Sequence, residues 1–137
     1  MIEGLLEFAL EQPPESLSPL TLAFVGDAVY ELYVRTRLVQ DGSRPPGKLH
    51  SFAVRYVNAG AQSRCIHNML DMLTDAERAV FKRGRNAKSH TAAKNADIAD
   101  YRQATGFEAL IGFVFLQKEY ARAEELMKLA FDQITAE

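Results

Sequence analysis

The sequence predicts an all-α protein that forms one domain. Apolar residues recur at helical spacing along most of the chain, and no segment alternates apolar and polar residues as a strand does. Clusters of proline and glycine, at residues 13–14 and 41–47, divide the chain into helix-sized segments. The 137 residues, of which 47% are hydrophobic and 25% charged, are enough to bury one core. We therefore expect a single domain over residues 1–137.

The expected helices begin and end at recognisable signals. Ser18 followed by Pro19 is a typical helix start, because proline at the first helical position loses no hydrogen bond. Thr74 and Glu77 have the spacing of a capping box. Residues 85–93 are polar and without pattern, which indicates a loop or an arm. The predicted helices span residues 2–11, 19–40, 48–60, 61–73, 74–84, 95–116 (with Asn95 as its cap) and 120–134.

Composition excludes several classes of protein. No apolar run reaches the roughly 18 to 20 residues that a membrane span requires, so we expect no membrane association. The first residues lack the basic and apolar segments of a secretory signal. A single cysteine, Cys65, cannot form an internal disulfide, which is typical of a reducing compartment. These features predict a cytoplasmic protein.

The stretch 18–31 carries an acid where an apolar stripe is expected. Asp27 follows Phe24 and Leu20 at helical spacing, on a stripe that should face the core. A buried carboxylate needs a partner, because desolvating a lone charge is very costly. Gly26 costs its helix about 1 kcal/mol relative to alanine, which a helix tolerates when another group must approach closely.

The stretch 104–116 repeats this pattern. Glu108 lies in a strongly apolar run, with Ala104 four residues before it and Gly112 four residues after it. Each acid alone is more often a surface residue, but two such helices in one short chain favour a shared site. We therefore expect Asp27 and Glu108 to meet where their helices cross and to hold a hard cation, for which carboxylate oxygens are the preferred ligands.

A basic segment provides the second candidate feature. The chain has a net charge of −2, yet residues 78–96 contain no acid. A locally basic surface of this kind binds phosphate even in an acidic protein. The alternative is a solvated loop, which beside a phosphodiesterase-like acid pair is less favoured. The candidate RNA-binding residues are Arg83, Gly84, Arg85, Asn86, Lys88 and Lys94. Gly84 is expected to let the backbone approach RNA closely.

Two motifs resemble the ribonuclease III family. Phe24-Val-Gly-Asp-Ala-Val29 resembles the core of its signature helix, and Glu108-Ala-Leu-Ile-Gly112 resembles its second signature. The resemblance covers nearly the whole chain and is closest to Mini-ribonuclease III, the bacterial form with the nuclease domain alone. Ordinary members carry further acids where this chain has Leu20, Ala23 and Thr105. Only two of the usual carboxylates therefore remain.

The resemblance implies an endoribonuclease with a ribonuclease III-like helical fold, acting as a twofold homodimer. It implies Asp27 and Glu108 as catalytic and metal-binding residues, Mg²⁺ as the cofactor with Mn²⁺ as a substitute, and double-stranded RNA as the substrate. In the Mini form the implied substrate is precursor 23S ribosomal RNA, and a large-subunit ribosomal protein is a candidate partner that presents it. The resemblance also implies that Leu20, Leu22 and Phe24 are shared between the core and the dimer interface.

Two other functions stay open at this point. One is a non-catalytic module that binds duplex RNA, having lost activity together with the acids at positions 20, 23 and 105. The other is an all-α nucleotide phosphohydrolase, because such enzymes also place acids on packed helices. An assay that offers labelled duplex RNA and nucleoside triphosphates, with Mg²⁺ and with chelator, separates the three.

Overall fold

The computed structural model describes residues 7–88 and 97–137, and these residues form helices without a strand. The all-α prediction is therefore confirmed. The α-helices are α1 (Pro19–Leu38), α2 (Pro46–Val57), α3 (Ala59–Met69), α4 (Asp75–Asn86), α5 (Ile98–Leu116) and α6 (Tyr120–Thr135), with short 3-10 helices at Pro14–Ser16 and Leu70–Met72. No helix in this described part is long and apolar enough to cross a membrane.

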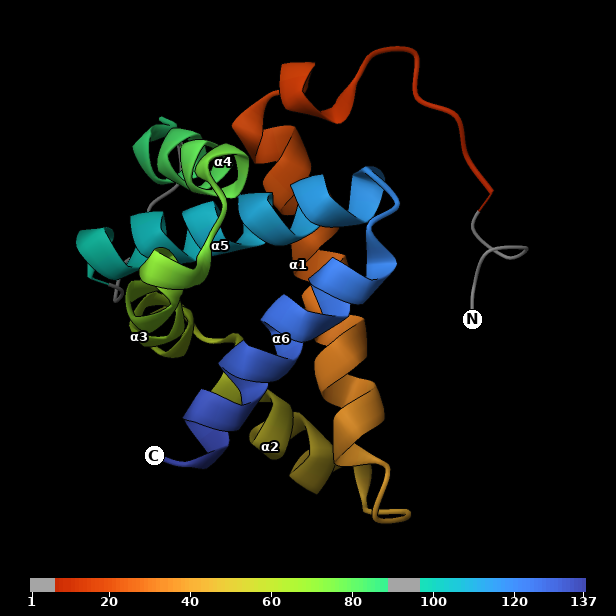
Figure 1. The fold of residues 1–137 in the computed structure, drawn as a ribbon. Helices are drawn as coiled ribbons and strands as arrows, with labels where there is room; N and C mark the ends of the chain where they lie inside the picture. The colour runs from red at the N-terminus through yellow and green to blue at the C-terminus, as the bar shows by residue number, and fades with distance from the viewer. Residues whose placement is uncertain (1–6, 89–96) are drawn as a thin grey trace.

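Helix α5 is the centre of the fold, and α1, α3, α4 and α6 pack around it (Figure 1). Its residues 104–114 are all buried except Glu108, which is partly exposed. A helix that is apolar on every face is typical of such a central position. The middle of α5 therefore places a single carboxyl group within the most enclosed part of the protein.

Helix α1 turns a different face to the core from the one that the sequence predicts. Leu22, Gly26 and Tyr30 are buried at i, i+4 and i+8, whereas Phe24 is 81% exposed and Leu20 39% exposed. Asp27 is also exposed, so its expected place on a core-facing stripe is wrong. The error arises because α1 is apolar on several faces, and periodicity alone cannot choose among them.

The helix boundaries agree with the remaining predictions to within a few residues, with three differences. The described part of the expected first helix, residues 7–11, is not helical, and its other residues lie outside the described part. Asn58 rather than Gly60 separates α2 from α3, because its side chain caps α3 by accepting from the Ala61 amide at 2.9 Å. Asp97 caps α5, and Asn95, the expected cap, lies outside the described residues.

The predicted capping box of α4 is present. The Thr74 hydroxyl accepts from the Glu77 amide, and the Glu77 carboxylate accepts from the Thr74 amide. Glu77 is 4% exposed and also binds Arg122 of α6, with N–O distances of 2.8 and 2.9 Å. This ion pair lowers the pKa of Glu77 and joins the start of α4 to α6.

Candidate active site

The site forms where α1 crosses α5, at a contact made possible by two glycines. A Cβ atom on Gly26 would lie 1.7 Å from the backbone oxygen of Glu108, and one on Gly112 would lie 2.0 Å from the backbone oxygen of Leu22. Any side chain at either position would force the helices apart. The two glycines therefore bring the backbone next to Asp27 against the backbone of Glu108.

The side chains of Asp27 and Glu108 meet at this crossing, as the sequence predicts. Burial, a hydrogen bond with Asp27 and the negative charge of Asp27 raise the pKa of Glu108 to about 9. Two carboxyl groups share a hydrogen bond only when one of them carries a proton. The pair therefore retains one proton when no cation is bound.

Glu31 is a third acid at the site that the sequence interpretation missed. It lies one helical turn after Asp27, and its negative charge also contributes to the raised pKa of Glu108. The four-residue spacing from Asp27 was the available signal. The Glu31 carboxylate accepts a hydrogen bond from Arg35 at 2.9 Å. Within residues 7–88 and 97–137, no group of three or more His, Cys, Asp or Glu side chains is placed to hold one metal ion.

The three positions at which the resemblance implied further acids, residues 20, 23 and 105, supply no carboxyl group. Ala23 and Thr105 are buried, and the Thr105 hydroxyl donates to the Tyr101 carbonyl of its own helix at 3.0 Å. Leu20 is exposed, and its side chain has no polar group. The donors that remain at the crossing are the carboxyl groups of Asp27 and Glu108. Two carboxylates match the usual protein contribution to a Mg²⁺ site, in which water completes the coordination.

The predicted RNA-binding residues fall into groups with different environments. The end of α4 and the residues just after it carry Arg85, Asn86 and Lys88. The Arg85 guanidinium lies 5.7 Å from the centroid of the Phe81 ring. Asn86 and Lys88 are exposed and Arg85 is partly exposed. These three side chains are available to a phosphate backbone. Lys94 lies outside the described residues.

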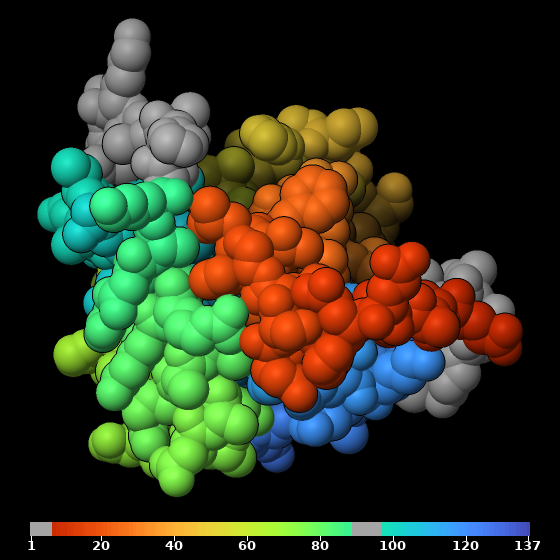
Figure 2. Space-filling view, turned by 90° about the horizontal axis from the view of Figure 1, so that it is seen from above, coloured from red at the N-terminus to blue at the C-terminus, as the bar shows by residue number. Residues whose placement is uncertain are grey.

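Arg83 and Gly84 have structural roles that the sequence interpretation did not foresee. Arg83 donates to the carbonyls of Glu15 and Leu17, at 3.0 and 3.1 Å, and so holds the segment before α1 against α4. Figure 2 shows this segment lying beside α4 on one face of the molecule. Gly84 is buried, and a Cβ there would lie 2.8 Å from the Ala109 Cβ of α5. The expectation that Gly84 opens the backbone to RNA is therefore wrong, because its close contact is with α5.

Comparison with known proteins gives one consistent family. Residues 20–119 match the family model of the ribonuclease III domain. The chain is 48% identical over 122 residues to Mini-ribonuclease 3 of Enterococcus faecalis, which covers 88% of this chain and 92% of that protein. It is 47% identical over 121 residues to Mini-ribonuclease 3 of Symbiobacterium thermophilum, covering 88% and 93% of the two chains.

A solved structure agrees with this grouping. The crystal structure of a protein from Fusobacterium nucleatum superposes with a TM-score of 0.77 at 29% identity, and the match covers 86% of this chain and 94% of that one. The matched domain spans both α1 and α5 and therefore includes the crossing that joins Asp27 to Glu108. The chain belongs to the ribonuclease III family, and within that family its relatives are the Mini-ribonuclease 3 proteins.

Proposed function

We propose that this endoribonuclease cleaves double-stranded RNA and that Asp27 and Glu108 hold the Mg²⁺ ion that the reaction requires. The observation that carries the proposal is the meeting of two carboxyl groups, one of them with its pKa raised to about 9, at a glycine-mediated helix crossing. Two carboxylates close enough to share a hydrogen bond repel each other unless a proton or a cation lies between them. A divalent cation fits this donor pair, and Mn²⁺ has the same ligand preference.

The protein residues contribute position and electrostatics to the reaction. When bound, Mg²⁺ supplies charge stabilisation for the scissile phosphate and lowers the pKa of a coordinated water. Glu108 is held rigidly by the buried turns of α5 on both sides of it, and Asp27 projects from the exposed side of α1. One carboxylate is therefore fixed by the core, while the other faces the substrate side. Glu31 adds negative charge that favours a cation at the pair.

Duplex RNA as the substrate is supported by the cationic end of α4. Arg85 and Lys88 belong to the acid-free stretch 78–96, and they lie at the end of a helix that packs against the same central α5. Duplex RNA is recognised mainly through its phosphates and 2′-hydroxyls, for which such side chains are suited. Among structured duplexes we propose the paired ends of precursor 23S ribosomal RNA, cleaved in the cytoplasm. A large-subunit ribosomal protein that presents this RNA is part of the same proposal.

A twofold homodimer is supported by apolar residues that α1 leaves exposed. Phe24 and Leu32 are 81% and 58% exposed and lie two turns apart on α1, and large exposed apolar side chains of this kind are typical of interfaces. Beside them is an apolar groove of about 570 Å³, lined by side chains that include Leu32, Phe115 and Met127. Because Phe24 and the groove lie on the same face of α1, a twofold axis can place each Phe24 against the groove of the other copy. Two sites in such a dimer would cut the two strands.

Substitution of the acid pair tests the catalytic assignment. We expect Asp27→Asn and Glu108→Gln each to lower the rate of duplex cleavage in Mg²⁺ by at least about a hundredfold, as loss of a key electrostatic group does, while the protein stays folded and binds RNA. Asp71→Asn is a matched control, because Asp71 is an exposed acid in the 3-10 helix Leu70–Met72 and does not line the groove beside α1. Wild-type cleavage by either site variant would show that the residue is not required. Labelled nucleoside triphosphates in the same assay test the phosphohydrolase alternative.

The dimer is tested separately by sedimentation. We expect Phe24→Ser to produce monomers at concentrations where the wild-type protein is dimeric, because it removes the most exposed apolar side chain of α1. Phe52→Ser, which changes a 45% exposed phenylalanine on α2, is the matched control. A Phe24→Ser protein that sediments as the wild type does would exclude α1 as the interface.

A further inference from the structure

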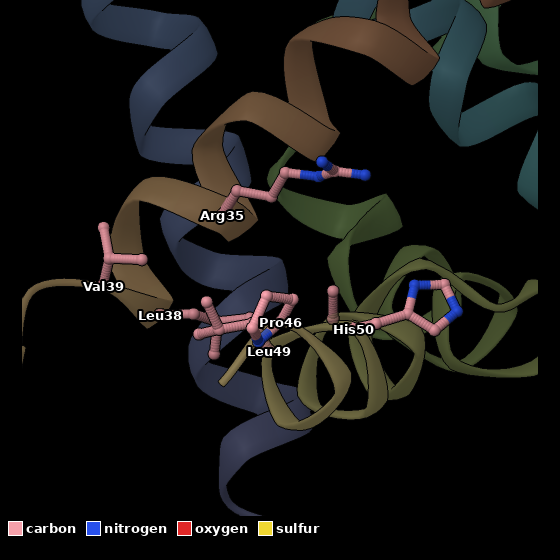
Figure 3. A pocket seen from close by; sticks show the side chains of 7 residues that line it. Arg35, Leu38, Val39, Pro46, Leu49 and His50 are labelled. Carbon is pink, nitrogen blue, oxygen red and sulfur yellow. The ribbon is translucent and has the colours of Figure 1, made fainter. Parts of the chain in front are cut away.

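At the C-terminal end of α1, a pocket lies between α1 and α2. The pocket has a volume of about 290 Å³, and Leu38, Pro46 and Leu49 provide much of its apolar lining. Arg35 of α1 and His50 of α2 also line it, and in Figure 3 their side chains extend toward the same side of the view. Among the described residues that line it, none is acidic. The pocket therefore combines an apolar floor with two groups that can donate hydrogen bonds to an anion.

The pocket is connected to the acid pair through one face of α1. Asp27, Glu31 and Arg35 follow one another at intervals of four residues, so they lie on successive turns of the helix. Eight residues of α-helix rise about 12 Å, which is the axial separation of Arg35 from Asp27. A duplex carries a phosphate every few ångströms along each strand. A strand whose phosphate is at the acid pair therefore passes other phosphates within reach of Arg35 when it follows this face.

The side chain of Arg35 is available for such a contact. It is 66% exposed, and its partner is Glu31 of the preceding turn, at 2.9 Å. An exposed pair at this spacing contributes little to stability. A guanidinium binds phosphate through two parallel hydrogen bonds, which is a stronger arrangement than this single one. A phosphate can therefore replace Glu31 as the partner of Arg35 at small cost.

The chain around the pocket has the charge that an anionic ligand requires. The segment from Gly42 to His50 contains Arg44, Lys48 and His50 and no acid. The first turn of α2 also has no acidic residue, so the positive end of its helix dipole is not neutralised locally. The charges of this segment complement an RNA backbone rather than a basic surface.

We infer that Arg35, with His50 beside it, is a substrate-positioning contact that binds a backbone phosphate of the duplex two helical turns from the acid pair. This inference rests on the proposal that duplex RNA is the substrate. In the free protein Glu31 holds the Arg35 guanidinium over the surface, and on binding the phosphate takes its place. The contact aligns the strand along α1 and takes no part in the chemical step.

The test compares Arg35→Ala with Glu31→Gln, because the two variants break the same ion pair from opposite sides. Binding of labelled duplex RNA is measured over a salt series in EDTA and in the Glu108→Gln background, so that neither cleavage nor a cation at the acid pair contributes. We expect Arg35→Ala to raise Kd about five- to tenfold and to lower the slope of log Kd against log salt by about 0.7 to 0.9. We expect Glu31→Gln to leave Kd unchanged or to lower it, because it frees Arg35. In proteins with Glu108 intact, Arg35→Ala should raise KM while kcat stays within about twofold, as expected when uniform binding is lost.

The control is Arg64→Ala, which removes another exposed, ion-paired arginine. Arg64 lies on α3, is 56% exposed and binds Glu137 at 2.8 Å. The inference is overturned if Arg35→Ala binds RNA as Arg64→Ala does, which is also the result expected of a pocket for a protein partner. It is equally overturned if Glu31→Gln weakens binding as much as Arg35→Ala, since the pair would then have only a structural role. Failure of the wild-type chain to bind or cut duplex RNA would overturn the proposed function as well, and the same assay distinguishes that result.

Discussion

The contact between Gly26 and α5 predicts that Gly26→Ala damages both stability and activity. The new Cβ would lie 1.7 Å from the Glu108 backbone oxygen, whereas real Cβ contacts are rarely under 3.0 Å. The helices must therefore separate by roughly 1 Å, and no flexible side chain can absorb the change because the obstructing atoms belong to the backbone. Closely packed interiors resist such a shift.

The magnitude follows from two opposing terms. Overpacking a core costs about 1 to 3 kcal/mol, and a backbone clash places this case at the upper end. Alanine returns about 1 kcal/mol through its higher helix propensity. The expected net loss is about 2 kcal/mol in the free energy of unfolding, which lowers Tm by about 8 °C in a domain of this size. Displacing a catalytic group by about 1 Å can cost a hundredfold in rate, so we expect cleavage to fall by a similar factor.

Thermal unfolding followed by circular dichroism, together with single-turnover cleavage, measures both effects. Gly47→Ala is the control, because Gly47 also lies in a helix but a Cβ there would meet no atom within 4 Å. We expect that control to keep or raise Tm. Gly112→Ala should resemble Gly26→Ala, since its Cβ would lie 2.0 Å from the Leu22 backbone oxygen. If Gly26→Ala and Gly47→Ala had the same Tm and the same rate, the account of this crossing would be refuted.

Two further predictions concern charged groups. Glu108→Gln should raise Tm in EDTA at pH 7.5, because folding raises the Glu108 pKa from 4.5 to about 9 and so makes the carboxylate unfavourable in the folded protein. The expected gain in the free energy of unfolding is at most about 4 kcal/mol. A fall in Tm would contradict the prediction. Arg122→Met should lower the free energy of unfolding at pH 7 by about 3 kcal/mol, because it leaves Glu77 buried without its partner. Since folding lowers the Glu77 pKa below 4.5, the wild-type pair contributes its stability above that pH and loses it as the pH falls through the folded pKa. The free energies of unfolding of the wild-type protein and of Arg122→Met, measured by urea titration from pH 7 to pH 3, should therefore approach each other as the pH falls. A difference that stays constant over this range would exclude the Glu77–Arg122 pair as the cause.

The sequence was sufficient for the helices and for the acid pair, because both depend on local signals. Capping residues and prolines located most helix boundaries, and an acid beside small residues in an apolar run located Asp27 and Glu108. It was insufficient for the orientation of α1, where Phe24 and Leu22 have similar hydrophobicity although one is exposed and the other buried. Which face of α1 packs against α5 depends on the close contact of Gly26 with Gly112, and these two residues are far apart in the sequence.

The wrong expectation for Gly84 has a similar cause. Arg83 and Gly84 have the residue types of a phosphate-binding loop, but α4 continues through them to Asn86. Their neighbours are then a backbone segment before α1 and the surface of α5, neither of which is adjacent in sequence. Glu31 was missed because its charge matters only through its proximity to Glu108 on another helix.

The central position of α5 has a consequence for how the protein opens in solution. A helix enclosed by four others exposes its amides to hydrogen exchange only when the surrounding helices separate, which is close to complete unfolding. Glu108 is therefore attached to the part of the backbone that exchanges most slowly, whereas the ends of α2 and α4 can fray without disturbing it. Local fluctuations at the rim can adapt to different RNA shapes while the position of the acid at the centre stays constant.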